Sequence, residues 1–308
     1  MDVTPAPWRL DRDELDEAVV RAAVEAARPN ARPAAIRYVG SGWDFDAWRV
    51  DDDLVRFPRR ASSAACLQRE LVFLPQVAER VSVPMPRLRW HGDPCPAFPY
   101  VFAAYSWLPG ETANVRLPAT AAWPRFAATY GRLVRDLHAI RPDELTAPPP
   151  EADAGSPDLR TQLLAALPRV EHVIAPGVGD RALDLLDGAG PDTGRPALAH
   201  GDLGPDHWLV GEDGDLAGVL DWTDASWATE NAEWTPLAIW FGADMLRLAL
   251  DAYGHTAPDD VLAWACGQAP AHVLCHLDAA MRWTDESART WMSRVAPRFL
   301  GLLATNDL

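Results

Sequence analysis

Two aspartates and a histidine are spaced so that a β-hairpin would bring them together. Asp202 lies in a polar loop that runs into a predicted hairpin over residues 208–220, and Asp221 follows its second strand. An Asp-Gly pair at the centre of the hairpin is a strong signal for a tight turn, and a hairpin returns the chain to its starting point. His207 lies where the loop enters the first strand. We therefore expect two carboxylates and one imidazole to converge on a small volume.

This arrangement suits phosphoryl transfer, which needs a carboxylate to orient and deprotonate the attacking hydroxyl and a divalent metal to neutralise the phosphates. Asp202 would serve as the base, and Asp221 with His207 would hold the metal. Mg²⁺ prefers oxygen ligands, so the histidine would ligate directly or through water. Each residue alone also has a structural explanation, because an aspartate in a Gly/Pro-rich loop commonly forms a turn.

The run from His200 to Val210, followed by Gly218 to Trp222, resembles the catalytic and metal loops of the aminoglycoside phosphotransferase family. Asn is commoner in that family where this chain has His207. A histidine there is similar to the macrolide 2′-phosphotransferases and the aminoglycoside 2″-phosphotransferases, and the segment from Asp221 to Ala225 is similar to the macrolide group.

The resemblance implies a bilobal protein-kinase-like fold of the α+β class. A nucleotide-binding lobe with an antiparallel sheet and a helix would span residues 1–106. A mainly helical lobe with the catalytic loop and substrate site would span residues 107–308. The resemblance also implies that Asp202 is the catalytic base and that His207 and Asp221 are ligands of Mg²⁺, with GTP or ATP as the phosphate donor.

Composition excludes several other chemistries. The 308-residue chain has no lysine, and all 28 of its basic residues are arginine. It can therefore form neither a lysine Schiff base nor a Walker A loop, and any cation that binds phosphate must be an arginine. The formal net charge of −16 disfavours nucleic acid and anionic membranes as partners and is compatible with a cationic small-molecule substrate.

Nothing in the sequence indicates a membrane or secreted protein. No stretch reaches the ~18 uninterrupted apolar residues of a membrane helix, and the first residues lack the pattern of a secretory signal. The four cysteines show no metal-binding or disulfide spacing. We expect a monomer in the cytoplasm.

The elements that must position these residues fall into two groups. The first third of the chain predicts a mainly antiparallel sheet with an inserted helix, and the rest predicts helices. The expected strands are 34–39, 45–50, 54–57, 87–91 and 100–106, and the expected helices are 13–28, 62–81 with a kink at Pro75, 123–140, 159–173 and 232–303.

Several residues of the first third occupy the positions expected of a kinase-like nucleotide site. Glycines in a loop between strands let the backbone approach phosphate. Arg56 occupies the place of the phosphate-binding lysine of kinases, and Glu70 the place of its helix partner. Arg59 and Arg60 are expected on a solvated face. The nucleotide site is thus predicted at Gly40, Ser41, Gly42, Arg56, Glu70, Ser106, Trp107 and Leu108, the last three as a hinge that binds the purine edge.

Substrate contacts are expected from acids and tryptophans downstream of the hairpin. Acids would attract an amine-bearing substrate, and tryptophans would line an apolar or sugar-stacking surface. The residues chosen are Asp224, Trp227, Asp278 and Trp283. His272 and His276 share a helical face and are interpreted as structural.

The predicted function is transfer of the γ-phosphate of GTP or ATP to a hydroxyl of a macrolide or aminoglycoside, which would confer antibiotic resistance. Three alternatives stay open. The chain could be a kinase of an endogenous amino alcohol or sugar metabolite, a degenerate kinase that only binds ligand, or a metal-dependent hydrolase built on His200, Asp202, His207 and Asp221. Nucleotide turnover that depends on an acceptor separates a kinase from a hydrolase.

Overall fold

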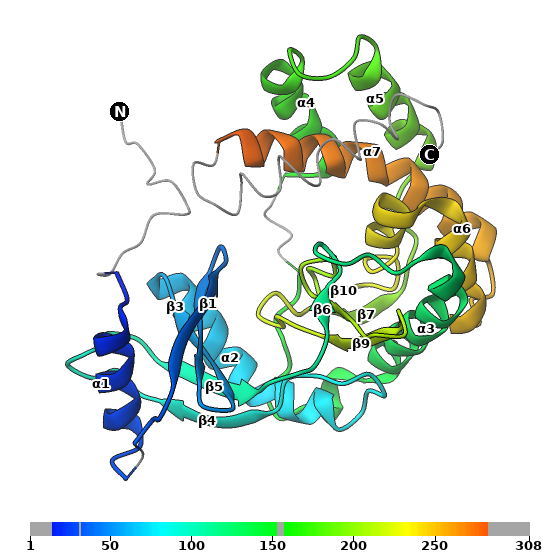
Figure 1. The fold of residues 1–308 in the computed structure, drawn as a ribbon. Helices are drawn as coiled ribbons and strands as arrows, with labels where there is room; N and C mark the ends of the chain where they lie inside the picture. Colours follow the sequence, from blue (N-terminus) through cyan, green and yellow to red (C-terminus); the bar gives the residue numbers. More distant parts are fainter. Residues whose placement is uncertain (1–13, 31, 153–156, 283–308) are drawn as a thin grey trace.

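An antiparallel five-stranded sheet forms the N-terminal part of the structure, a computed structural model that describes residues 14–30, 32–152 and 157–282 (Figure 1). The strand order is β1-β2-β3-β5-β4. The strands are β1 (Ile36–Ser41), β2 (Phe45–Val50), β3 (Asp53–Pro58), β4 (Leu88–Gly92) and β5 (Phe102–Ser106), and the helices of this part are α1 (Glu17–Ala27) and α2 (Ala61–Ala78).

The two faces of this sheet bury different sets of side chains. Because successive side chains of a strand point to opposite faces, Phe102 and Ala104 of β5 join a cluster with α1, whereas Ala103 and Tyr105 join a cluster with α2. The helix α2 buries residues at helical spacing, and Glu70 belongs to this buried face. A carboxylate is thereby held against the sheet from inside the protein.

The C-terminal part, as far as residue 282, combines short strands with longer helices. Its strands are β6 (Glu111–Thr112), β7 (Pro196–Ala199), β8 (Trp208–Val210), β9 (Leu216–Val219) and β10 (Ser226–Thr229). Its helices are α3 (Trp123–Ala139), α4 (Leu159–Val170), α5 (Val178–Ala189), α6 (Thr235–Tyr253) and α7 (Pro258–Arg282), with short 3₁₀ turns at Thr120–Ala122 and Pro142–Glu144. Helix α7 packs against α4, α5 and α6 (Figure 1).

The predicted antiparallel sheet and helical C-terminal part are confirmed, and Pro75 lies inside α2 as the sequence predicted. Two parts of the prediction differ from the structure. The region expected to be helical over 232–303 is interrupted twice within the described residues, because Gly242 (φ 78°, ψ −174°) breaks α6 internally and Gly254 adopts a left-handed φ of 81° that ends α6. Helix α5 and the pairing of β7 with β10 were not predicted. The expected helix beyond residue 282 lies outside the described residues.

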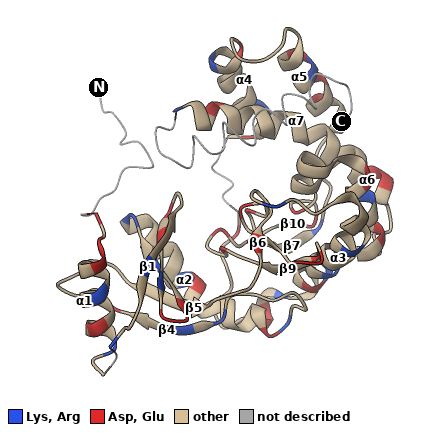
Figure 2. Ribbon diagram, in the orientation of Figure 1, with Lys and Arg blue, Asp and Glu red and all other residues tan. Residues whose placement is uncertain are grey.

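Charged side chains are spread over both parts of the molecule (Figure 2). Within the described ranges, no helix combines the length and the apolar character that crossing a bilayer requires.

Candidate active site

The loop between β7 and β8 is fixed by His200, a fully buried histidine. Its Nε2 lies 2.9 Å from the carbonyl oxygen of Leu220 and its Nδ1 lies 3.3 Å from the backbone nitrogen of Asp202. Since a carbonyl accepts and an amide donates, the ring is neutral with the proton on Nε2. Burial and the neighbouring His207 lower the pKa of His200 to about 3. The loop is thus tied to the residue that follows β9.

Gly201 and Glu233 hold the same loop from the other side. Gly201 has φ 85°, and a Cβ there would lie 2.3 Å from the carbonyl oxygen of Asp224, so only glycine fits. The buried carboxylate of Glu233 accepts hydrogen bonds from the backbone N–H groups of His200 (2.6 Å) and Gly201 (3.3 Å). Burial raises the pKa of Glu233 to about 7, against these hydrogen bonds. Glu233 therefore supports the loop.

The predicted convergence of Asp202, His207 and Asp221 is present in the structure. His207 Nδ1 lies 2.7 Å from the carbonyl oxygen of Asp202 and 3.6 Å from its Oδ2. On the other edge of the ring, Nε2 lies 3.9 Å from Asp221 Oδ2. When the ring is neutral, donation from Nδ1 to the carbonyl leaves the Nε2 lone pair directed toward Asp221.

The carboxylate of Asp202 is accessible, with 61% of its side chain exposed. It nevertheless lines a cavity together with other acids. Desolvation raises its pKa to about 6, against the stabilising effect of His207 and together with the negative charges of Asp224, Asp221 and Asp206. The group is therefore a stronger proton acceptor than an isolated aspartate.

Arg56 of β3 links the sheet to Asp221. Its Nη1 lies 3.1 Å from Glu70 Oε2, and its Nη2 donates to Asp221 Oδ1. The hydroxyl of Tyr105 donates to the other oxygen of Glu70, at 2.5 Å. The ring of Phe45 covers the guanidinium at 4.0 Å. The pairing of Arg56 with Glu70 that the sequence predicted is present, and Tyr105 and Phe45 complete it.

The electrostatics of this network favour ionised Asp221. Burial alone would raise its pKa, but the charges of Arg56 and His207 and a hydrogen bond from Thr223 (2.8 Å) hold the pKa well below its usual range. Asp221 also has an uncommon positive φ of 56°. For Glu70 the burial dominates, and its pKa is raised despite Arg56.

His207 and Asp221 fit a divalent cation whose remaining ligands would come from water and a bound nucleotide. Arg56 occupies Oδ1 of Asp221, whereas Oδ2 faces His207 Nε2. Among the described residues, no group of three or more His, Cys, Asp or Glu could hold a metal ion alone. Mg²⁺ is commonly bound by one or two protein groups plus water and substrate phosphates, which matches a pair of ligands.

The predicted glycine loop joins β1 to β2. A Cβ at Gly40 would meet nothing within 4 Å, so space next to the backbone is open. The expectation that Arg59 and Arg60 form a solvated face is wrong. Arg59 pairs with Asp46 at 3.0 Å and contacts Ser41, while Arg60 pairs with Asp44 beside the loop, and both arginine side chains are about 15% exposed or less. They anchor this loop to the residues that precede α2.

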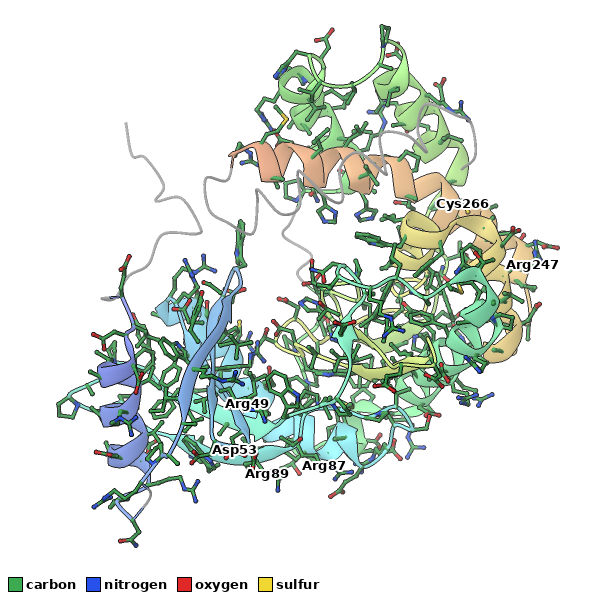
Figure 3. The ribbon with its side chains drawn as sticks, in the orientation of Figure 1. Arg49, Asp53, Arg87, Arg89, Arg247 and Cys266 are labelled. Atoms are coloured by element: carbon green, nitrogen blue, oxygen red, sulfur yellow. The ribbon has the colours of Figure 1, made fainter. Side chains whose placement is uncertain are left out.

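The predicted hinge begins at Ser106, the last residue of β5. The backbone N–H of Ser106 donates to the carbonyl oxygen of Arg87 at 2.9 Å, so it is already used. Trp107 is 41% exposed, with the guanidinium of Arg49 4.8 Å from its ring. Figure 3 labels Arg49 on β2, Asp53 on β3, Arg89 on β4 and Arg87 just before β4, and Arg89 lies 4.0 Å from Asp53. Ser106, Trp107 and Leu108 stay the predicted hinge residues, with the N–H of Ser106 not available to a purine edge.

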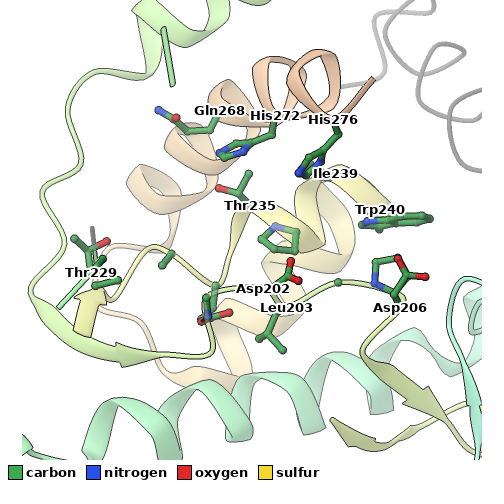
Figure 4. A pocket seen from close by; sticks show the side chains of 18 of the residues that line it. Asp202, Leu203, Asp206, Thr229, Thr235, Ile239, Trp240, Gln268, His272 and His276 are labelled. Carbon is green, nitrogen blue, oxygen red and sulfur yellow. Dashed lines mark hydrogen bonds between the residues drawn. The ribbon is translucent and has the colours of Figure 1, made fainter. Parts of the chain in front are cut away.

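A cavity of about 740 Å³ opens beside Asp202 and reaches α7 (Figure 4). Of the four residues predicted to contact substrate, three lie among the described residues, and each of these has a different environment. Asp224 is exposed next to the catalytic loop. Trp227 is partly buried against the core. Asp278 does not line this cavity, because its side chain is 4% exposed and paired with Arg169 and Arg282. Trp283 lies outside the described residues.

Sequence reasoning missed the residues of α7 that do line the cavity. They are Trp264, Gln268, His272 and His276, together with the small residues Ala279 and Ala280. The signal for the first four was their spacing of four residues, which places them on one helix face. The two histidines were interpreted as structural, yet their rings point from α7 toward the side of the cavity where Asp202 lies (Figure 4).

Comparison with known proteins places the chain among phosphotransferases. No curated protein sequence matches it significantly. Similar solved structures include the GDP complex of aminoglycoside 2′-phosphotransferase-IIIa (20% identity, TM-score 0.75, covering 96% of this chain and 100% of that one). Others are a macrolide 2′-phosphotransferase type I (20%, 0.62, 92% and 99%) and a macrolide 2′-phosphotransferase from Brachybacterium faecium (23%, 0.57, 92% and 97%).

These likenesses confirm the predicted protein-kinase-like α+β fold. The profile of the phosphotransferase enzyme family matches residues 35–265. Since this match covers most of the sequence and includes both the sheet and the catalytic loop, the chain belongs to the phosphotransferase enzyme family.

Proposed function

We propose that this protein transfers the γ-phosphate of GTP or ATP to a hydroxyl of an antibiotic-like small molecule, a macrolide or an aminoglycoside, and so confers resistance. One observation carries the proposal. The exposed carboxylate of Asp202 faces a cavity of about 740 Å³, and His207 connects it to Asp221 and the buried arginine network. The structures similar to this chain include complexes with GDP, ADP and ATP, which supports a nucleotide donor.

Each side chain has a defined task in this proposal. Asp202 orients the acceptor hydroxyl and accepts its proton, for which its raised pKa is suited. His207 and Asp221 hold Mg²⁺, which would neutralise charge on the phosphates. Arg56 presents a permanent positive charge to the nucleotide. Glu70 fixes the direction of the Arg56 guanidinium.

The division of labour between the lobes follows from these roles. Residues 1–106 bind the nucleotide, with the loop from Gly40 to Gly42 over the phosphates. The hinge of Ser106, Trp107 and Leu108, where the two lobes join, lies beside the base. Residues 107–308 carry the catalytic loop and the acceptor site. The strongly acidic charge favours a cationic acceptor and disfavours nucleic acid and membranes. With four free cysteines, we place the protein in the cytoplasm as a monomer.

A panel of acceptors tests this function. Macrolides, aminoglycosides and simple amino alcohols are each incubated with the protein, Mg²⁺ and either GTP or ATP, and the phosphorylated product is measured. Turnover of an amino alcohol alone would identify a kinase of a metabolite. Nucleotide hydrolysis that does not depend on any acceptor would identify a hydrolase.

The variant Asp202→Ala tests the assigned base. We expect transfer to fall by about 10³-fold, since general base catalysis contributes on the order of 10²- to 10⁴-fold, while the nucleotide dissociation constant stays unchanged. The same change at Asp213, an exposed residue in the turn of the β8–β9 hairpin, serves as control and should leave transfer unaltered. Unchanged turnover in Asp202→Ala would overturn the proposal.

A further inference from the structure

Four uncharged side chains form a continuous stripe along α7. They are Trp264, Gln268, His272 and His276, which recur every four residues and line the cavity that contains Asp202. Figure 4 labels the last three. Residues four apart on a helix are neighbours on one face. We call this set the α7 stripe.

The α7 stripe offers hydrogen bonds without charge at neutral pH. Tryptophan and glutamine do not ionise. Burial, reinforced by the neighbouring His276, lowers the pKa of His272 to about 4. The pKa of His276, which lies exposed at the end of the stripe, is lowered as well. The neutral imidazole of His272 provides one donor and one acceptor. The stripe is therefore polar but not ionic.

The acids of α7 are directed elsewhere. Asp278 is buried against Arg169 (Nη2 to Oδ2, 2.8 Å) and Arg282 (3.0 Å). Asp259 pairs with Arg247 at 2.7 Å. Over the described length of α7, residues 258–282, no carboxylate lines the cavity.

The carboxylates that do line the cavity belong to other elements. Glu233 is occupied by the catalytic loop, and Asp192 accepts hydrogen bonds from Thr229 and Asn231. Asp202 and Asp206 of the catalytic loop are exposed, and so is Asp192, which lies between α5 and β7. None of these described acids belongs to α7, so the negative charge available to a ligand comes from the other elements that line the cavity.

We propose that the α7 stripe is the surface that selects the acceptor, and that it favours a bulky, mainly apolar molecule with neutral oxygen groups and a single amine over a molecule with many amines. The proposal rests on the function proposed above. A hydroxyl or carbonyl can exchange hydrogen bonds with Gln268 and His272, and an apolar body can pack on Trp240 and Ile239 of α6. One ammonium group can be directed to the catalytic loop.

A polycation meets a penalty on the same surface. Ammonium groups spread over the whole molecule would be pressed against neutral side chains, and removing a charge from water without a partner is costly. The cavity of about 740 Å³ is large enough for a bulky ligand, since ligand pockets commonly span ~300–1,000 Å³.

Equilibrium titration of the full chain with two probes tests this selection. The probes are a macrolide that carries one dimethylamino sugar and kanamycin, which carries several amines. We expect the macrolide to bind at least about tenfold more tightly, which corresponds to ~1.4 kcal/mol. Equal or tighter binding of kanamycin would overturn the proposal, as would the absence of binding by either probe.

The variant Gln268→Glu tests whether the α7 stripe is responsible for this selection. It adds one negative charge with almost no change in shape, so the ratio of macrolide to kanamycin affinity should fall at least about tenfold. The matched control is Gln162→Glu, the same change on the exposed surface of α4, which should leave this ratio unaltered. An unchanged ratio in Gln268→Glu, with an unfolding temperature equal to that of the control, would contradict the proposal.

Binding and transfer are measured separately, so the two proposals can fail independently. If phosphate transfer occurs but kanamycin is the better ligand, the function holds and the role of the stripe is overturned. If the macrolide is preferred and Gln268→Glu removes the preference, but neither GTP nor ATP yields a phosphorylated product, the stripe is supported and the function fails.

Discussion

The two walls of the proposed site use opposite chemistry. On the side of the sheet, Arg56 joins Glu70 and Asp221 in a network of full charges. On the side of α7, the stripe that includes Gln268 and His272 carries no charge at neutral pH. Phosphate handling needs charge in a fixed place, whereas acceptor selection depends on shape and neutral hydrogen bonds. The acceptor wall can therefore change without disturbing the charged network.

Removing the centre of the charged network should have the largest effect. Arg56→Ala leaves the buried Glu70 and the partly buried Asp221 without their shared partner, so we expect the free energy of unfolding to fall by about 3 kcal/mol. Urea unfolding followed by circular dichroism measures this. Arg247→Ala is the control, because its pair with Asp259 is exposed and should contribute no more than about 0.5 kcal/mol. Equal losses of unfolding free energy in both variants would show that the buried network contributes no more to stability than an exposed ion pair.

Asp278, the buried acid of α7 that does not line the cavity, should affect protein stability but not the binding of an acceptor. Asp278→Asn keeps the size of the side chain but weakens its bonds to Arg169 and Arg282, at a cost of about 2 kcal/mol. The dissociation constant of a cationic probe should stay the same. A weaker affinity measured by titration would place Asp278 in the acceptor wall after all, and would break the contrast between the walls.

Tyr105→Phe tests how far the charged network depends on its outermost hydrogen bond. The variant removes the hydroxyl that donates to Glu70, and hydrogen bonds to charged groups contribute about 1.5 kcal/mol or more. Tyr130→Phe is a matched change, since that hydroxyl donates to the uncharged carbonyl of Glu233 at 2.6 Å, and it should cost only about 1 kcal/mol. A larger loss in Tyr130→Phe would argue against a charged Glu70.

The neutral wall should respond to acid. His272 has a folded-state pKa of about 4, below its unfolded value of 6.5, so the unfolded chain binds a proton that the folded chain excludes. Stability is therefore lost as the pH falls from about 6.5 toward 4, by about 2 kcal/mol for this residue at pH 5. In His272→Asn, the difference in unfolding free energy between pH 7 and pH 5 should be smaller by this amount. An unchanged difference would mean that His272 is protonated in the folded protein.

The charged side of the site could be predicted because its signals are local. A hairpin with an Asp-Gly turn fixes the approach of Asp202 and Asp221 through the register of two adjacent strands. The place of Arg56 on a strand and Glu70 on the next helix follows from their order in the chain. The partners of Arg59 and Arg60 could not be predicted, because they depend on how the loop before β2 folds back.

The place of the α7 stripe in the cavity could not be predicted from the sequence, for a different physical reason. The spacing from Trp264 to His276 shows which residues share a helix face, but not which face is turned to the cavity. That choice is made by packing of α7 against α4, α5 and α6 and by the break at Gly254. Asp278 was selected for its charge, and only the tertiary position of Arg169, more than a hundred residues away in the sequence, reverses its role.

The guanidinium at the centre of the charged network has a consequence for inhibitor chemistry. Reagents that block nucleotide sites by acylating a lysine, or by forming an imine with it, need a side-chain amine. This chain has none, and Arg56 is 9% exposed beneath the ring of Phe45. Covalent blockers of that kind would have no side-chain target in the cleft, so the protein would escape them through its composition, without any change in the shape of the site.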